Sequence, residues 1–290
     1  MEPLILISWF LGGCSGIGLE AARLLARKKA TVHVIDLSPF PEQQPDNEYD
    51  SKIRYWRCDV TDWLAMKHIF DTIGCIDMAF ANAGVSENPS FIMDLLSLDE
   101  PRYDRLIDVN FRAVLIVIKL AAAGMNRHGI QGSIVLTSSA TAYAPEASLP
   151  VYSALKLGVV GLVRSLRSTL IRSNITINAV APAATITSLL PRELAAPIIA
   201  AGLPVSSARF VGRALVYSAV ANQSQAVEIY GKDKPELLTS NGRWNGRVIL
   251  TLGESYTEME EILSGTKGHW FGEENLRLTN LQQTVTDFGA

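Results

Sequence analysis

The sequence has few of the features that mark several large protein classes. Its three cysteines are an odd number without a CxxC pair, which argues against a disulfide framework and favours reduced, buried thiols. Its four histidines are scattered, so we propose no metal site. The 26 basic residues are outnumbered by 29 acidic ones, and no basic stripe is present to neutralise the phosphates of a nucleic acid. The length of 290 residues and the hydrophobic content of 48% instead fit one large α/β domain or two small ones.

The sequence also lacks a long apolar run. Its most apolar N-terminal segment, residues 4–11, is far shorter than the ~20 residues that a membrane-spanning helix needs. The segment follows Glu2 instead of a basic region, and it leads into glycines instead of a cleavage site. We therefore interpret it as a buried strand and expect a cytoplasmic protein.

Short apolar segments alternate with longer amphipathic ones along the chain. This alternation is typical of right-handed βαβ units, which build an α/β fold with a central parallel sheet and helices on both faces. Strands are expected at residues 4–10, 31–36, 53–58, 76–81, 133–138, 175–181 and, as the last strand, 246–253. Helices are expected at residues 16–29, 63–73, 101–127 and 151–173.

The sequence shows no internal repeat and no linker between two domains. We expect residues 1–253 to form one domain and residues 254–290 to form a C-terminal tail, with a surface loop at 39–51. Residues 188–205 are apolar and alanine-rich without strand periodicity, and we interpret them either as a mobile substrate lid or as part of the packed shell. Aromatic residues of the tail, such as Trp270 and Phe271, need a surface to cover, on the same subunit or on a neighbour.

A glycine-rich loop joins the first expected strand to the first expected helix. The segment Gly12–Gly18 reads GGCSGIG, where glycines permit a tight turn and let the backbone approach a pyrophosphate at the helix N-terminus. Asp36 ends the second strand about 20 positions later, where a carboxylate can bond both ribose hydroxyls and repel a 2′-phosphate. The alternative is that Asp36 is only a solvated strand-end residue. The pattern favours NAD over NADP.

A second set of residues suits proton transfer. Tyr152 and Lys156 are four positions apart in YSALK, so a helix places both on one face. An ammonium beside a phenol stabilises the phenolate and lowers the tyrosine pKa, as general acid–base catalysis near neutral pH requires. Ser139 follows a strand at the carboxyl edge of the sheet, where ligands bind, and could hold a substrate oxygen.

Taken together, these motifs resemble the short-chain dehydrogenase/reductase family over nearly the whole stretch 4–253. Each motif is weak alone, but all occur in the family's order and spacing. The resemblance implies a single doubly wound Rossmann fold. The matching segments are GGCSGIG at 12–18, Asp36, CDVTD at 58–62, ANAG at 81–84, Asn110 in DVNF, Ser138 and Ser139, YSALK at 152–156, and INAVAPAATIT at 177–187.

The resemblance also implies roles for individual residues. Asp59 and Val60 would face the adenine, and Asn110 would hold a water that relays protons from Lys156. Ile186 and Thr187 would contact the carboxamide and phosphates of the cofactor. The full set implied to bind the cofactor is Gly12, Ser15, Gly16, Ile17, Gly18, Asp36, Leu37, Asp59, Val60, Asn82, Ala83, Gly84, Tyr152, Lys156, Pro182, Ile186 and Thr187.

Two positions depart from the family pattern. Leu11 stands where a threonine usually tethers the glycine loop to the segment around Asn82. Ala183 replaces the glycine of a Pro-Gly turn, which would strain the backbone if φ there is positive. Both residues that transfer protons, Tyr152 and Lys156, are retained.

We expect an NAD-dependent oxidoreductase that interconverts a secondary alcohol and a ketone. In oxidation the Tyr152 phenolate would take the hydroxyl proton, Ser139 would orient the oxygen, and Lys156 with Asn110 would pass the proton to solvent. The alternative is a non-redox protein of this fold, a cyclase, an isomerase or an NAD-sensing binding protein, with Leu11 and Ala183 as signs of decay.

The expected partners are a small substrate and further copies of the chain. An apolar lid favours a hydrophobic alcohol or ketone of terpenoid, steroid or polyketide type, as in specialised metabolism, although the same side chains could only pack the lid onto the body. The resemblance favours a homodimer or homotetramer whose two long helices bury Val114, Ile118 and Val159. The apolar lid residues are Leu189, Leu190, Leu194, Ile198, Ile199 and Leu203.

Overall fold

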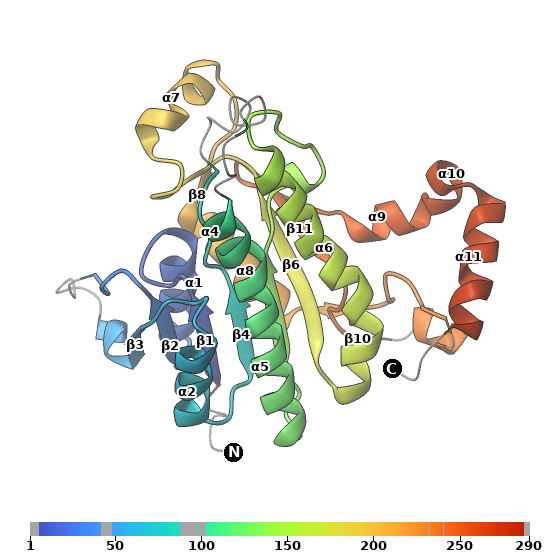
Figure 1. Cartoon of the computed structure of the whole chain (residues 1–290), viewed down its shortest axis with the longest axis horizontal. Helices are drawn as coiled ribbons and strands as arrows, with labels where there is room; N and C mark the ends of the chain where they lie inside the picture. Colours follow the sequence, from blue (N-terminus) through green and yellow to red (C-terminus); the bar gives the residue numbers. More distant parts are fainter. Residues whose placement is uncertain are drawn as a thin grey trace.

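The computed structural model describes residues 6–41, 48–87, 98, 103–231, 233–239 and 241–286. An eight-stranded sheet crosses the centre of this part of the chain, in the order β12-β11-β6-β5-β4-β1-β2-β3 (Figure 1). All neighbouring strands pair in parallel except β11 and β12. The strands are β1 (Ile7–Leu11), β2 (Thr31–Asp36), β3 (Ile53–Arg57), β4 (Met78–Ala81), β5 (Ser133–Thr137), β6 (Thr176–Pro182), β11 (Val248–Leu252) and β12 (Ser255–Glu258).

Helices cover both faces of the sheet and bury two hydrophobic clusters against it (Figure 1). One face carries α2 (Trp63–Ile73), α5 (Ala113–Arg127) and α6 (Pro150–Leu170), and the other carries α1 (Gly16–Arg27) and α8 (Ala208–Val220). Strand residues contribute to both clusters, so the parallel strands are buried on both faces, as is usual for parallel sheets. The structure confirms the predicted doubly wound α/β fold with helices on both faces.

Several elements match the sequence prediction, and one differs in an informative way. β2 and α2 have the predicted bounds. The described part of the predicted helix 101–127 consists of α4 (Asp104–Ile107), a π-helical turn η2 (Asp108–Arg112) and α5. The predicted helix 151–173 is α6 followed by the 3₁₀ turn η4 (Ile171–Ser173).

The C-terminal part has more structure than the sequence pattern predicts. β11 is not the last strand, because β12 turns back and pairs with it antiparallel. The sheet therefore extends into the segment assigned to the tail, and a division of the chain at residue 253 stays a prediction. After β12 come α9 (Glu260–Gly265), α10 (Lys267–Phe271) and α11 (Glu273–Val285), which project from one side of the body in Figure 1.

The sequence analysis does not predict the helix α8. Several shorter elements complete the described structure. No helix within the described ranges is long and apolar enough to cross a membrane. Of the predicted loop 39–51, residues 42–47 lie outside the described residues, and η1 begins at Glu48. The remaining short elements are η1 (Glu48–Lys52), η3 (Ala140–Ala142), β7 (Thr185–Ile186), α7 (Arg192–Ala200), β8 (Ser206–Ser207), β9 (Asn222–Gln223), η5 (Pro235–Thr239) and β10 (Gly242–Arg243).

The prediction that association buries Val114, Ile118 and Val159 is wrong. All three are already buried in the core of the single chain, since the faces of α5 and α6 that carry them pack on the sheet. The large apolar residues that these two helices leave exposed are Leu115 and Leu157.

Candidate active site

A cavity of about 600 Å³ lies at the carboxyl ends of the parallel strands. β1 pairs with β2 on one side and with β4 on the other, so the chain order reverses at β1, which is where open α/β sheets bind ligands. The cavity extends from Asp36 at one end to Tyr152 at the other. Predicted site residues that line it are Gly12, Ser15, Gly16, Ile17, Asp36, Leu37, Val60, Asn82, Ala83, Gly84, Ser139, Tyr152, Lys156, Pro182 and Thr187.

The glycine loop is packed so closely that side chains do not fit at two positions. Gly12 has a φ of +71°, and a Cβ there would lie 2.7 Å from the Cα of Ala83. A Cβ on Gly18 would lie 2.1 Å from the carbonyl oxygen of Gly12. Gly18 does not line the cavity, and its bare Cα instead lets the start of α1 pack on the loop. The loop can therefore offer its backbone to a ligand.

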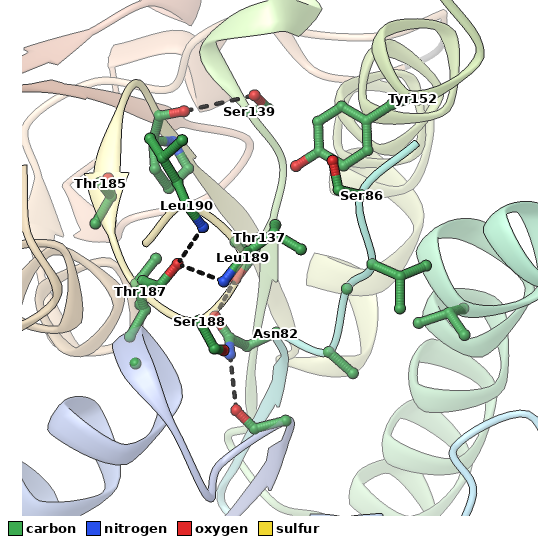
Figure 2. Close-up of a pocket in the computed structure, with 18 of the residues that line it drawn as sticks. Asn82, Ser86, Thr137, Ser139, Tyr152, Thr185, Thr187, Ser188, Leu189 and Leu190 are labelled. Carbon is green, nitrogen blue, oxygen red and sulfur yellow. Dashed lines mark hydrogen bonds between the residues drawn. The ribbon is translucent and has the colours of Figure 1, made fainter. Parts of the chain in front are cut away.

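Leu11 does not leave the glycine loop untethered. Its carbonyl accepts a hydrogen bond from the Asn82 N–H at 3.2 Å, and the Asn82 amide donates to the Gly12 carbonyl at 2.9 Å. Thr137 then donates to the Asn82 Oδ1 at 3.1 Å (Figure 2). The Leu11 side chain is buried in the hydrophobic core. Asn82 therefore makes the connection that the missing threonine hydroxyl would supply.

The Asp36 end of the cavity holds a carboxylate fixed by the backbone. Its two oxygens accept the N–H groups of Cys14 at 3.1 Å and Ser38 at 2.9 Å. Burial, and secondly the charge of Asp36, raises the pKa of the Cys14 thiol to about 12, so this thiol is protonated at neutral pH. Leu37 and Ser38 continue the wall beside it.

An arginine distant in sequence also reaches this end. Arg105 of α4 lines the cavity and donates to the Asp59 carboxylate at 2.9 Å. Asp59 also accepts hydrogen bonds from the N–H and hydroxyl of Thr61. Burial raises the pKa of Asp59, but these hydrogen bonds outweigh burial and lower it. Asp59 is thus engaged by neighbouring side chains, while Val60 lines the cavity.

The opposite end brings Ser139, Tyr152 and Lys156 together. Ser139 caps the 3₁₀ turn η3, and its hydroxyl accepts the Thr141 N–H at 3.2 Å and donates to the Pro182 carbonyl at 3.5 Å (Figure 2). Tyr152 lies in the first turn of α6, and the Lys156 Nζ lies 5.4 Å from the centroid of its ring. Tyr152 and Lys156 therefore share one helix face, as their spacing predicts.

The protonation equilibria of this pair follow from burial. Lys156 is 2% exposed and donates to the Thr137 carbonyl at 2.9 Å. Burial lowers the pKa of Lys156 to about 8. Burial also raises the pKa of Tyr152 to about 12, although its hydrogen bond with Ser139 acts in the opposite direction. The protein by itself thus does not show the lowered tyrosine pKa that the spacing predicts.

Asn110 is fully buried in the π-helical turn η2, not exposed as an asparagine in a long helix usually is. Its amide donates to the carbonyls of Val85 at 2.9 Å and Leu106 at 3.1 Å, and its Oδ1 accepts the Val85 N–H at 3.3 Å. π-Helical turns often occur at functional sites. Asn110 does not line the cavity but holds the segment after β4 that does.

The segment after β6 forms the wall that faces this strand edge. The φ angle of Ala183 is not positive, so alanine causes no backbone strain at this position where the family usually has glycine. The Thr187 hydroxyl accepts the N–H groups of Leu189 and Leu190, which fold against the cavity (Figure 2). Ile186 lies beside this wall in β7 without lining the cavity.

The apolar lid residues divide into two groups. Leu189 and Leu190 line the cavity. Leu194, Ile198, Ile199 and Leu203 do not line it. Ile198 is half-buried, while Leu194, Ile199 and Leu203 are exposed to solvent at 67%, 40% and 58%. Residues 188–205 contain the short helix α7, in which Ala195 is the buried residue.

Sequence reasoning misses several residues of the cavity. Arg105 and Thr137 carry no motif signal of their own, since they act through contacts with distant residues. Ser86 and Glu146 add polar groups to the cavity wall. Of the predicted site residues, four do not line the cavity: Gly18, Asp59, Asn110 and Ile186.

Comparisons with known proteins agree with this geometry. The sequence model of the short chain dehydrogenase family matches residues 7–196. The chain is 51% identical over 282 residues to the short-chain dehydrogenase/reductase prx4 of Penicillium rubens, covering 96% of this chain and 83% of that protein. It is 50% identical over 282 residues to the short-chain dehydrogenase/reductase ATR7 of Stachybotrys chlorohalonatus, covering 96% of this chain and 86% of that protein.

Solved structures share the fold. The 3-ketoacyl-(acyl-carrier-protein) reductase of Brucella melitensis, complexed with NADH, superposes with a TM-score of 0.68 at 20% identity, over 86% of this chain and 97% of that one. A short chain dehydrogenase/reductase family protein superposes with a TM-score of 0.63 at 27% identity, over 75% of this chain and 90% of that one. The resemblance seen in the motifs is confirmed, and the chain belongs to the short-chain dehydrogenase/reductase family of oxidoreductases.

Proposed function

We propose that the protein is an NAD-dependent oxidoreductase that interconverts a secondary alcohol and a ketone on a hydrophobic small molecule. The observation that carries this proposal is a single cavity with the glycine loop and Asp36 at one end and Ser139 and Tyr152 at the other. The family uses a nicotinamide cofactor. An alcohol carbon placed near Tyr152 would therefore lie at the far end of a bound dinucleotide.

The residues present fit such a cofactor. At Gly12 a Cβ would collide with the Ala83 backbone, so the loop keeps its peptide groups bare at the start of α1. Free N–H groups and the helix dipole at that point favour a pyrophosphate. The cavity volume lies within the range of ~300–1,000 Å³ usual for small-molecule sites. Gly12 to Ile17 would hold the pyrophosphate, and Asn82 to Gly84 the adenosine side.

The preference for NAD rests on the charges at the Asp36 end. The Asp36 carboxylate is held by two backbone N–H groups and would accept the ribose hydroxyls, while its charge would repel a 2′-phosphate. Arg105, a cation that lines this end, is already paired with Asp59. We expect NADH to bind at least about tenfold more tightly than NADPH, and Asp36→Ala to narrow this difference. Tighter binding of NADPH would contradict the assignment.

In the proposed reaction each residue at the other end has one task. When bound, the nicotinamide ring would accept or supply the hydride. Ser139 would hold the substrate oxygen, and the Tyr152 oxygen would take its proton in oxidation and return it in reduction. A protonated Lys156, buried beside the ring, would favour the phenolate. The proton relay through Asn110 stays a prediction, for which its Oδ1 has one acceptor position left beyond Val85.

The side chains at the substrate end support a mainly apolar substrate. Leu149, Leu189 and Leu190 line this end together with several alanines. Terpenoid, steroid and polyketide alcohols of specialised metabolism are the compounds we would test first. The non-redox alternative loses the two features that suggested it, because Asn82 makes the tether that the threonine missing at position 11 would supply, and Ala183 is unstrained.

The test is turnover of a panel of apolar secondary alcohols with NAD, compared between the wild type and Tyr152→Phe. We expect NADH formation by the wild type and a loss of about 10³-fold or more in Tyr152→Phe, since the phenyl ring cannot take a proton. NADH should quench tryptophan fluorescence equally in both proteins. NADH binding without turnover on any compound would favour a binding protein instead.

We also propose a cytoplasmic homo-oligomer. Cys14, Cys58 and Cys75 are free thiols, which suits a reducing compartment. Leu115 and Leu157, exposed at 42% and 48% on α5 and α6, would be covered in a dimer or tetramer. Light scattering that gives the mass of a monomer would contradict this arrangement.

A further inference from the structure

Glu87 is a buried carboxylate beside the proposed catalytic tyrosine, and no sequence motif marks it. It is 7% exposed and lies three residues after Gly84, at the end of the segment that follows β4. Its Oε2 accepts the backbone N–H of Tyr152 at 2.8 Å. The contact joins two segments 65 residues apart in the chain.

The start of α6 needs this contact. The first N–H groups of a helix have no partner within the helix, and a capping side chain usually satisfies one of them. Here the N-cap residue is Leu149, which cannot accept a hydrogen bond through its side chain, and the first turn of α6 contains no acidic residue. Glu87 therefore supplies from another segment the cap that α6 lacks.

The segment that carries Glu87 is itself held in place. The side chain of Asn110 bonds both the N–H and the carbonyl of Val85, and Asn82 fixes the start of the segment to the glycine loop. Glu87 thus connects α6 to the part of the molecule that would carry the cofactor. One turn further along α6, Lys156 is anchored separately at the Thr137 carbonyl.

A second feature of Glu87 suggests more than a structural role. Its Oε1 is buried and has no hydrogen-bond partner within the part of the chain that the structure describes. A buried, half-satisfied carboxylate is costly, although the positive end of the α6 dipole offsets part of that cost. A native structure keeps such a group only where it serves a purpose. The hydrogen bond that the buried Glu87 carboxylate does make is with the backbone of Tyr152, so its role is to be sought at that residue.

We propose that Glu87 is a positioning residue that fixes the Tyr152 phenol relative to Ser139 by accepting the Tyr152 N–H. The inference rests on the proposed function, because it assumes that Tyr152 transfers the proton. A misplacement of a reacting group by about 1 Å can cost about 10²-fold in rate. Losing the contact should therefore lower kcat and leave cofactor binding nearly unchanged.

Two substitutions of Glu87 separate the effect of its hydrogen bond to Tyr152 from the effects of side-chain size and polarity. Glu87→Gln keeps an acceptor for the Tyr152 N–H, whereas Glu87→Met has a similar size and suits a buried site but accepts no such bond. Glu254→Met replaces a carboxylate that is exposed after β11 and serves as the matched control. All variants would be compared for thermal unfolding, NADH affinity, kcat and KM.

We expect Glu87→Met to lower kcat by about 10- to 100-fold while the NADH dissociation constant changes by less than about threefold. Glu87→Gln should restore kcat to within about threefold of the wild type, and Glu254→Met should not change it. Hydrogen exchange of the peptide that spans the start of α6 should be faster in Glu87→Met only. A kcat in Glu87→Met equal to that of the wild type, or equally low values in the Gln and Met variants, would overturn the proposal.

A double-mutant test links the effect to the phenol. In a Tyr152→Phe background, Glu87→Met should lower the residual rate by less than about twofold, because there is no phenol left to position. A full additional loss would show that Glu87 acts elsewhere and would overturn the proposal. If the wild type shows no Tyr152-dependent turnover, the proposed function fails instead, and the exchange rate at the start of α6 still decides whether Glu87 holds that helix.

Discussion

The two ends of the cavity are built in different ways. At the cofactor end the backbone of the glycine loop is packed so closely that an added Cβ has no room at Gly12 or Gly18, and the Asn82 side chain holds the loop in place. The substrate end consists of side chains such as Ser139 and Leu190 on segments that follow the strands, and the nearby helix α7 exposes its leucine, Leu194, to solvent. An added side-chain atom at Gly12 or Gly18 would collide with neighbouring backbone, whereas much of the wall at the other end is built from side chains whose size can vary.

This difference separates what all members of such a fold share from what distinguishes them. Binding a dinucleotide needs bare peptide groups at a helix end, which only a few sequences can provide. Selecting an alcohol needs only a cavity of suitable shape with an acceptor and donor near the reacting carbon. The comparison predicts that substitutions at the first end abolish cofactor binding, and that those at the second change rates and KM values.

The largest effect is expected for Gly18→Ala at the cofactor end. The new Cβ would lie 2.1 Å from the Gly12 carbonyl oxygen, so the loop must move away from α1. We expect a cost of roughly 3 kcal/mol or more, which is a loss of over a hundredfold in NADH affinity, a loss of stability, or both. Fluorescence titration with NADH and urea unfolding measure the two parts.

The matched control for this change is Gly161→Ala in α6, where the added Cβ would meet no described atom within 4 Å beyond the backbone of its own helix turn. There alanine should leave NADH affinity unchanged and raise the stability by about 0.5–1 kcal/mol, because glycine is a poor helix residue. If Gly18→Ala behaved like Gly161→Ala, the cofactor end would not be the rigid region that we describe.

The next largest effect is expected for Ser139→Ala at the substrate end. Removing the hydroxyl takes away the partner of the substrate oxygen, and we expect kcat to fall by about 10²-fold. NADH affinity should stay within about twofold, since the cofactor would be held mainly at the other end. A parallel loss of NADH binding would show that the two ends are coupled instead of separate.

The same contrast explains which parts were predictable from sequence. The glycine loop, Asp36, and the pair Tyr152 and Lys156, which line one cavity, can be predicted as site candidates because each motif depends on a particular residue type at a fixed spacing. β2 and α2 were placed correctly because their apolar periodicity is clear. A feature that depends only on residues close together in the chain can be recognised from the sequence.

Other features depend on contacts between distant segments and cannot be recognised in this way. Glu87 and Arg105 act on residues 65 and 46 positions away, so no spacing points to them. The burial of Asn110 follows from a π-helical turn that a helical pattern does not distinguish from α-helix. The antiparallel β12 was missed because its four residues are mostly polar and exposed at the sheet edge.

A smaller effect, on stability, is expected for Lys156→Met. Burial lowers the pKa of Lys156 from 10.5 to about 8, so between these values the unfolded chain binds more protons and stability rises with pH. Below pH 8 Lys156 is protonated in the folded state as well, so the full free-energy cost of burying its charge lowers the stability. We expect Lys156→Met to be inactive and yet more stable at pH 7 by roughly 1–3 kcal/mol.

The gain from Lys156→Met should shrink as the pH rises from 7 to 10, where the wild-type amine is already neutral. Urea unfolding at the two pH values checks this, with the exposed Lys119→Met of α5 as control. An equal gain at both pH values would mean that packing, not charge, accounts for it. In that case the buried charge of Lys156 would not destabilise the proposed catalytic end of the cavity.

The smallest effects are expected in the lid, where they decide between its two interpretations. Leu190 lines the cavity, so Leu190→Ala should raise the KM of an apolar alcohol by about three- to tenfold through lost apolar contact. Leu194 is 67% exposed, and Leu194→Ala should change KM by less than about twofold if α7 stays where it is. If both substitutions raise KM equally while NADH affinity is unchanged, α7 must turn Leu194 inward over the substrate, and residues 188–205 act as a closing lid. If only Leu190→Ala has an effect, the segment after Thr187 forms the substrate wall and α7 belongs to the outer shell.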